Sequence, residues 1–141
     1  MGQSTFIKLV PASKQTTITL QEVTNLLMYY QTITQKTGEQ LSYHYEQHAF
    51  PYEIIEQQKN DTNYLYLKGR DNSLYHYLVI GTGVETTDED ETHAFIQIVL
   101  PKGATYADKN KANEFAKFFA KKLNGELHLF NGRIMYFYKQ K

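Results

Sequence analysis

An apolar stripe near the C-terminus constrains the fold of this 141-residue chain more than any other feature. Six residues recur there at helical spacing: Ala112, Phe115, Ala116, Phe119, Ala120 and Leu123. The opposite side of the same helix carries charged residues: Glu114, Lys117 and Lys121. Thr105 and Asp108 have the spacing of a capping box, and Gly125 is a natural stop. The sequence therefore predicts a helix between Thr105 and Gly125 that buries one face against another layer.

A second helix is expected nearer the N-terminus. Thr19 and Glu22 form another capping box, and an apolar stripe follows it: Val23, Leu26, Leu27, Tyr30 and Ile33. Gly38 is a natural stop, so we expect this helix over residues 20–36. Residues 39–50 are ambiguous, and one interpretation is a short helix that ends before Pro51.

Much of the remaining sequence alternates in the manner of β-strands. We expect a first strand over residues 4–10, which Pro11 ends. Four more such runs come after the first helix: Tyr52 to Gln57, Tyr64 to Lys68, Leu74 to Ile80, and Ala94 to Leu100. Short polar loops separate these runs, which predicts an antiparallel meander.

The dipeptide Asn131-Gly132 predicts a C-terminal hairpin, because two-residue type I′ turns prefer this pair. Such a turn pairs Leu129 with Ile134 and Leu127 with Tyr136. We expect these four side chains and that of Tyr138 to share one face.

The predicted elements follow the order strand, helix, four strands, helix and hairpin. This order leaves few parallel crossovers, so we expect an α+β fold with a mainly antiparallel sheet. It is similar to the element order of TATA-box-binding-protein-like folds with a C-terminal hairpin added, a similarity that carries no function. The length fits one domain, and we expect a single domain over residues 1–141.

Composition excludes several classes of protein. The chain has no cysteine, which excludes a disulfide scaffold, a thiolate zinc site and a cysteine nucleophile. A cysteine-free chain fits a reducing compartment. No apolar run approaches 18 residues, and the N-terminus lacks the pattern of a signal peptide. We therefore expect a cytoplasmic protein with no membrane partner.

The net charge of zero hides an uneven distribution of charge. Residues 52–105 hold four basic and nine acidic residues, whereas residues 106–141 hold eight basic and three acidic ones. The basic end is open to two interpretations: a solvated helix face, or a surface for an anionic partner or a second copy of the chain. A nucleic acid is not the expected partner, because the net charge is zero and no RRM motif is present.

Three patterns resemble functional sites without completing them. Gly81 and Gly83 open a dinucleotide fingerprint that lacks its third glycine, so we interpret them as a strand end or a bulge with positive φ. The acidic residues between 85 and 91 lack the spacing of an EF-hand and are expected at a solvated hairpin tip. His44 and His48 lack the glutamate of a zincin motif. We therefore predict no cofactor, no metal and no catalytic residue.

The tyrosines are the most suggestive residues. Tyr64 and Tyr66 alternate with leucines on one predicted strand, and Tyr75 and Tyr77 lie on the next. We expect the four to form a patch on one sheet face, with Lys68 and Arg70 beside them. Tyrosine combines a large apolar ring with a polar tip, which suits a protein or small-molecule partner. Cross-strand pairing without a function is the alternative.

The leading hypothesis is therefore a non-enzymatic binding or regulatory module of unknown ligand. A small enzyme with a histidine and carboxylate site is one alternative, for which His44 or His48 would have to meet carboxylates in a pocket. A weak anion or nucleic-acid binder that uses the basic C-terminal helix is another.

Five segments carry a family resemblance: FIKLVP at 6–11, TGEQL at 37–41, AFPYEI at 49–54, KANEF at 111–115 and ELHLFNGR at 126–133. Together they resemble a small uncharacterised family, a domain of unknown function, of Gram-positive spore-forming bacteria. The resemblance spans nearly the whole chain. It implies a cytosolic α+β protein and supplies neither an activity nor functional residues.

Overall fold

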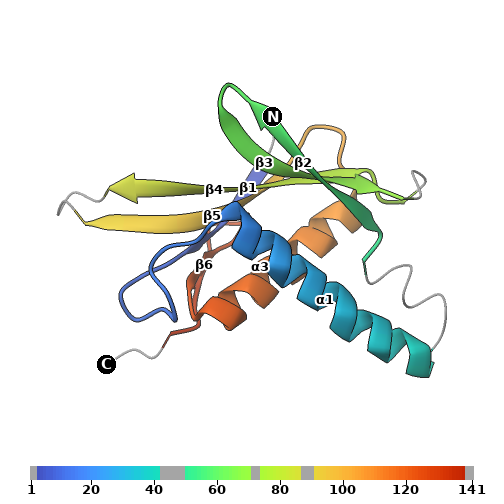
Figure 1. The fold of residues 1–141 in the computed structure, drawn as a ribbon, viewed down its shortest axis with the longest axis horizontal. Coiled ribbons are helices and arrows are strands. Elements are labelled where there is room, and N and C mark those ends of the chain that lie inside the picture. The colour runs from blue at the N-terminus through green and yellow to red at the C-terminus, as the bar shows by residue number, and fades with distance from the viewer. Residues whose placement is uncertain (1–2, 42–49, 71–73, 87–90, 139–141) are drawn as a thin grey trace.

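A computed structural model describes residues 3–41, 50–70, 74–86 and 91–138, with residues 35–41 described by their backbone only. The described strands are β1 (Gln3–Lys8), β2 (Tyr52–Lys59), β3 (Thr62–Gly69), β4 (Tyr77–Thr86), β5 (Thr92–Leu100), β6 (Glu126–His128) and β7 (Ile134–Tyr136). They form one sheet in the order β2-β3-β4-β5-β1-β6-β7. The helices α1 (Leu20–Leu41) and α3 (Tyr106–Leu123) lie on the same side of this sheet (Figure 1).

The fold is α+β, and every neighbouring pair of strands is antiparallel. The predicted fold class, element order and C-terminal hairpin are confirmed. The N-terminal strand β1 lies between β5 and β6, so it joins the meander of β2 to β5 to the hairpin of β6 and β7. Neither helix in the described part of the chain has the length and hydrophobicity that a bilayer crossing requires.

The core lies between the sheet and the two helices. Alternate strand residues point into it, as strand geometry requires: Ile7, Leu65, Leu67, Leu78, Ile80, Ile96, Ile98 and Leu127 are all buried, and so is Leu9 just after β1. The predicted stripe of α3 is buried from Ala112 to Leu123. Helix α3 packs against β1, β4, β5 and β6, and α1 packs against β3. The Tyr30 ring of α1 meets Phe115 of α3 edge-on, with the centroids 5.2 Å apart.

Both predicted capping boxes are present. Glu22 N–H donates to the Thr19 hydroxyl at 3.1 Å, and Thr19 N–H donates to the Glu22 carboxylate at 3.0 Å. Thr105 and Asp108 make the same reciprocal pair at the start of α3. These side chains satisfy N–H groups that have no partner within the helix, which explains why both helices begin where the sequence indicates.

The predicted helix ends are wrong in detail. Helix α1 continues past Gly38 to Leu41. Helix α3 ends at Leu123, and its C-cap Asn124, rather than Gly125, takes the left-handed conformation (φ 52°) expected of a glycine. Asparagine tolerates this conformation better than most residues. Gly125 serves a different purpose, because a Cβ atom there would lie 3.1 Å from both Ile7 Cγ2 and the Lys8 carbonyl oxygen.

Strand β4 begins and ends later than the predicted run of Leu74 to Ile80. Gly81 and Gly83 therefore lie inside the strand, and the interpretation of a strand end with positive φ is wrong. Positive φ among the described glycines occurs at Gly103 and Gly132. Gly83 leaves room for the Phe95 ring, because a Cβ atom there would lie 2.5 Å from it.

The register of the C-terminal hairpin differs from the predicted one by one residue. Leu127 pairs with Met135, and His128 pairs with Ile134. Leu129 N–H donates to the Arg133 carbonyl, and Gly132 has a φ of 86°. This is a three-residue loop with a glycine bulge in place of the two-residue type I′ turn. The extra loop residue shifts all the pairs, so the predicted common face of Leu127 and Tyr136 does not form.

Candidate functional site

The candidate site is the face of the sheet that the helices leave uncovered, here called the open face (Figure 1). Its side chains alternate along the strands with those of the core. The residues that define it are half-buried: Phe6, Lys8, Tyr64, Tyr66, Tyr77, Val79, Phe95, Gln97 and His128. The open face therefore offers aromatic rings at the β3–β4 side and polar groups at the β1–β6 side.

Three of the four predicted tyrosines lie on the open face. The rings of Tyr66 and Tyr77 are stacked, with centroids 5.9 Å apart and an interplanar angle of 18°. The Tyr77 hydroxyl donates to the Lys102 carbonyl oxygen at 2.6 Å, and the Tyr64 hydroxyl donates to Gln57 Oε1 at 3.1 Å. These contacts hold the hydroxyl groups, so part of the entropy cost of fixing the rings is met before any partner binds.

The predicted placement of Tyr75 on this face is wrong. Tyr75 precedes β4 and is only 9% exposed, and its ring lies 5.8 Å from that of Tyr52 in the core. Strand alternation begins only at Tyr77, because the preceding segment folds closely against β3. His76 O accepts from Gly69 N–H at 2.8 Å, and a Cβ atom on Gly69 would overlap the Tyr75 backbone. Burial is the main cause that raises the pKa of the Tyr75 hydroxyl.

The two predicted basic residues differ in their surroundings. Lys68 is exposed and pairs directly with Tyr77 across β3 and β4, which places it beside the tyrosines. Arg70 donates from its Nε to the Tyr52 carbonyl oxygen at 3.1 Å, and its N–H donates to the Pro51 carbonyl oxygen at 2.8 Å. Lys68 therefore borders the open face, whereas Arg70 holds the start of β2.

The middle of the open face has open space at a glycine. Gly81 lies two residues beyond Val79, the partner of Tyr66, and no other atom lies within 4 Å of the point where its Cβ would be. On the neighbouring strands β1 and β5, Phe6 and Phe95 meet edge-on with centroids 5.6 Å apart. A flat apolar group could therefore lie between the tyrosines and the phenylalanines.

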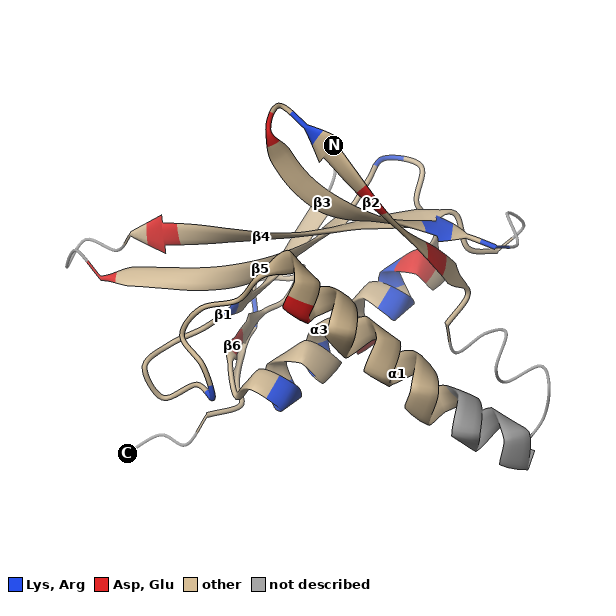
Figure 2. Ribbon diagram, in the orientation of Figure 1, with Lys and Arg blue, Asp and Glu red and all other residues tan. Residues whose placement is uncertain are grey.

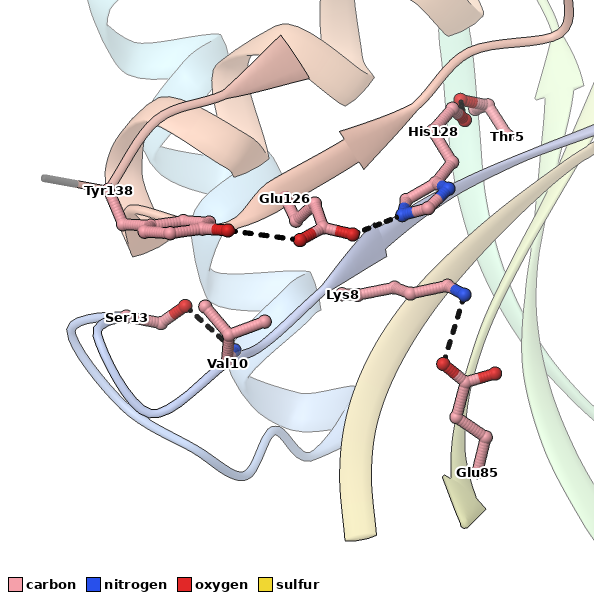
Figure 3. A network of polar contacts seen from close by, with 8 residues as sticks. All are labelled: Thr5, Lys8, Val10, Ser13, Glu85, Glu126, His128 and Tyr138. Carbon is pink, nitrogen blue, oxygen red and sulfur yellow. Dashed lines mark hydrogen bonds and ion pairs between the residues drawn. The ribbon is translucent and has the colours of Figure 1, made fainter. Parts of the chain in front are cut away.

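Sequence reasoning missed the polar end of the open face, which Figure 3 shows. His128 Nε2 lies 2.6 Å from Glu126 Oε1, and the Tyr138 hydroxyl donates to the other Glu126 oxygen at 3.1 Å. Lys8 forms an ion pair with Glu85 across β5, at 3.0 Å. The alternation of Glu126 and His128 around a buried leucine was the signal that could have revealed this pair.

The Glu126–His128 pair has a defined chemical consequence. When Nε2 donates to the carboxylate, Nδ1 of the neutral ring is left as a hydrogen-bond acceptor. In the described ranges, no three histidine, aspartate or glutamate residues are grouped so that they could hold a metal ion. His44, His48 and the acidic residues 88–90 lie outside the described residues.

A buried carboxylate supports the aromatic end of the site. Asp108 is fully buried and accepts from Thr105 N–H at 2.9 Å, from His76 N–H at 3.1 Å and from the Tyr52 hydroxyl. Burial, and then the hydrogen bond to Asp108, raise the pKa of Tyr52 above its ordinary value of 10. The start of α3 is thereby attached to the segment that presents Tyr77.

Comparison with known proteins shows the family to which the chain belongs but gives no activity. The chain matches the family described as "Domain of unknown function (DUF1885)" over residues 3–139. It therefore belongs to this family.

One solved structure is similar over most of its length, and its title is "Crystal Structure of Protein of Unknown Function from Bacillus stearothermophilus". The identity is 49%, the match covers 90% of this chain and 93% of that one, and the TM-score is 0.56. A search of the curated proteins found no match. The resemblance inferred from the sequence is thus confirmed as far as a family of unknown function, and the similar solved protein comes from a bacterium.

Proposed function

We propose that this protein is a non-enzymatic binding module whose open face binds a partner through Tyr64, Tyr66 and Tyr77. The observation that carries this proposal is the stacked pair of Tyr66 and Tyr77 on the uncovered face. Tyrosine is enriched at binding hot spots, because it provides a large contact area at a small entropy cost.

The chemistry of the open face indicates the kind of partner. The rings and the open space at Gly81 suit a flat apolar group, such as an aromatic side chain of a protein or a ring of a small molecule. Lys68 lies at the border of the tyrosines and suits an acidic group on the same partner.

The test is affinity capture from an extract of the source bacterium, with bound proteins and small molecules identified by mass spectrometry. The double variant Tyr66→Ser/Tyr77→Ser should lose the captured partner. Tyr106→Ser is the matched control, because Tyr106 is 87% exposed on α3, away from the open face. Equal capture by the wild type and the double variant would contradict the proposal.

A small enzyme is the second candidate, and the contact between Glu126 and His128 is the observation that favours it. A panel of nitrophenyl esters and phosphates would test for hydrolysis. Activity that disappears in His128→Gln but persists in Tyr66→Ser would favour the enzyme over the binding module.

We further propose that residues 1–141 act as one domain in the cytoplasm of a Gram-positive spore-forming bacterium. The similar solved protein from Bacillus stearothermophilus and the cysteine-free composition support this proposal. Immunoblots of separated cell fractions would test the location, and a single cooperative unfolding transition would test the domain.

A further inference from the structure

A pocket lies on the helical side of the sheet, away from the open face. This pocket has a volume of about 340 Å³. Helix α3 contributes Lys109, Asn113 and Lys117 to its wall, and the opposite wall comes from the loop of the C-terminal hairpin. Such a volume is sufficient for a small organic ligand.

The α3 side of the pocket is a stripe of basic and amide groups. Lys109, Asn113 and Lys117 are spaced four residues apart, so they lie on one face of the helix. The Cα atoms of the two lysines are about 12 Å apart along the helix axis, a span that two long side chains can bridge toward one ligand. Across the described residues, neither lysine has a carboxylate within ion-pair distance.

The nearby acidic residues are engaged elsewhere. Residues 106–141 contain three of them, and Figure 2 shows lysines along α3 with acidic residues at the far tip of β4 and β5. Asp108 is buried among hydrogen-bond donors. Glu114 lies 2.8 Å from Lys111, and Glu126 lies 2.6 Å from His128 on the other side of the sheet. The positive charge of the pocket is therefore not neutralised by these groups.

The hairpin side of the pocket is apolar with amides at its rim. Leu129 and Phe130 are half-buried there, and Gln3 and Asn131 complete the wall. Lys109 Nζ lies 5.9 Å from the centroid of the Phe130 ring, which places positive charge next to an aromatic surface. Charge and ring together suit a ligand that has an anionic head and a flat body.

We propose that this pocket binds a phosphate monoester that carries an aromatic ring. A phosphate has a charge close to −2 and three acceptor oxygens, which match two lysines and an amide better than a single carboxylate does. The head lies between Lys109 and Lys117, and the ring lies against Phe130. No atom of the open face takes part in this site.

The test is isothermal titration calorimetry of the full chain with phenyl phosphate, inorganic phosphate and phenol. Phenyl phosphate should bind more tightly than either fragment. Lys109→Gln and Lys117→Gln should each weaken binding by about fivefold, the effect of one partly exposed charge pair. Lys121→Gln is the matched control, because Lys121 is exposed on the same helix and does not line the pocket.

Three results would overturn the proposal. Phenyl phosphate would fail to bind the wild type at millimolar concentration, or inorganic phosphate would bind equally well, or Lys121→Gln would weaken binding as much as Lys117→Gln. Amide chemical shifts supply a further check: those of residues 109–117 and 129–131 should move on titration, and those of β3 should not.

Discussion

The carboxylate of Asp108 accepts the backbone N–H of His76 with both of its oxygens, each at 3.1 Å, although 32 residues separate the two in sequence. The same group accepts Tyr77 N–H at 3.4 Å and the Tyr52 hydroxyl. One fully buried side chain thus connects α3 with β2 and with the start of β4. The first residue of β4 is also a member of the candidate binding face, so this contact positions the site.

Removal of Asp108 should therefore destabilise the whole protein. Asp108→Ala leaves several buried donors without an acceptor, and we expect a loss of about 3 kcal/mol or more in the free energy of unfolding. Tyr52→Phe removes a single donor and should cost about 1–2 kcal/mol. Urea denaturation measures both values. Lys121→Ala, on the exposed side of α3, is the control, and an Asp108→Ala variant as stable as that control would refute the interpretation.

The two glycines of β4 should respond in opposite ways to alanine. Gly83→Ala places a methyl group 2.5 Å from the Phe95 ring and should cost about 1–3 kcal/mol. Gly81→Ala enters open space and should be neutral or slightly stabilising, because glycine inside a strand carries an entropy cost. Thermal unfolding of the two variants and of the wild type measures these differences in stability. If the two variants were destabilised equally, the cause would lie in strand formation and not in the contact between position 83 and Phe95.

The N-terminal cap of α1 should make stability depend on pH. Hydrogen bonds from Gln15 and from Thr19 N–H lower the pKa of Glu22 below its ordinary value of 4.5. A lowered pKa in the folded state means that the stabilisation is complete above pH 4.5 and is lost as the pH falls through the folded value. At pH 7, Glu22→Gln should therefore melt below the wild type, and the difference in Tm should shrink as the pH falls below 4.5. A difference in Tm that stays constant would rule out this linkage.

The bulge of the C-terminal hairpin should depend on its glycine. Gly132 has a φ of 86°, so Gly132→Ala should cost about 1 kcal/mol in the free energy of unfolding. Gly132→Asn should cost less, because asparagine tolerates positive φ better. Chemical denaturation of the two variants tests this order. If Gly132→Ala were as stable as Gly132→Asn, the hairpin loop would have to form a different turn, without a positive φ at position 132.

Short-range patterns in the sequence determined the helices and strands of this protein. Helical spacing from Ala112 to Leu123 and the capping box at Thr105 predicted α3, because both depend on neighbours within one or two turns. Alternation in β3 predicted that Leu65 and Leu67 point inward while the two tyrosines between and before them point outward. The α+β class and the element order follow from these same short-range patterns.

Contacts between distant segments decided the rest. Tyr75 is buried because the chain folds against β3 before alternation begins, and Asn124 ends α3 where Gly125 must pack on β1. A single extra loop residue set the register of the last hairpin. The pairing of Asp108 with Tyr52, and the pocket between α3 and the hairpin, join parts of the chain that no window of sequence contains. The sequence by itself determined which faces are apolar, and only the tertiary structure decided which side chains meet, because packing optimises contacts across the whole chain.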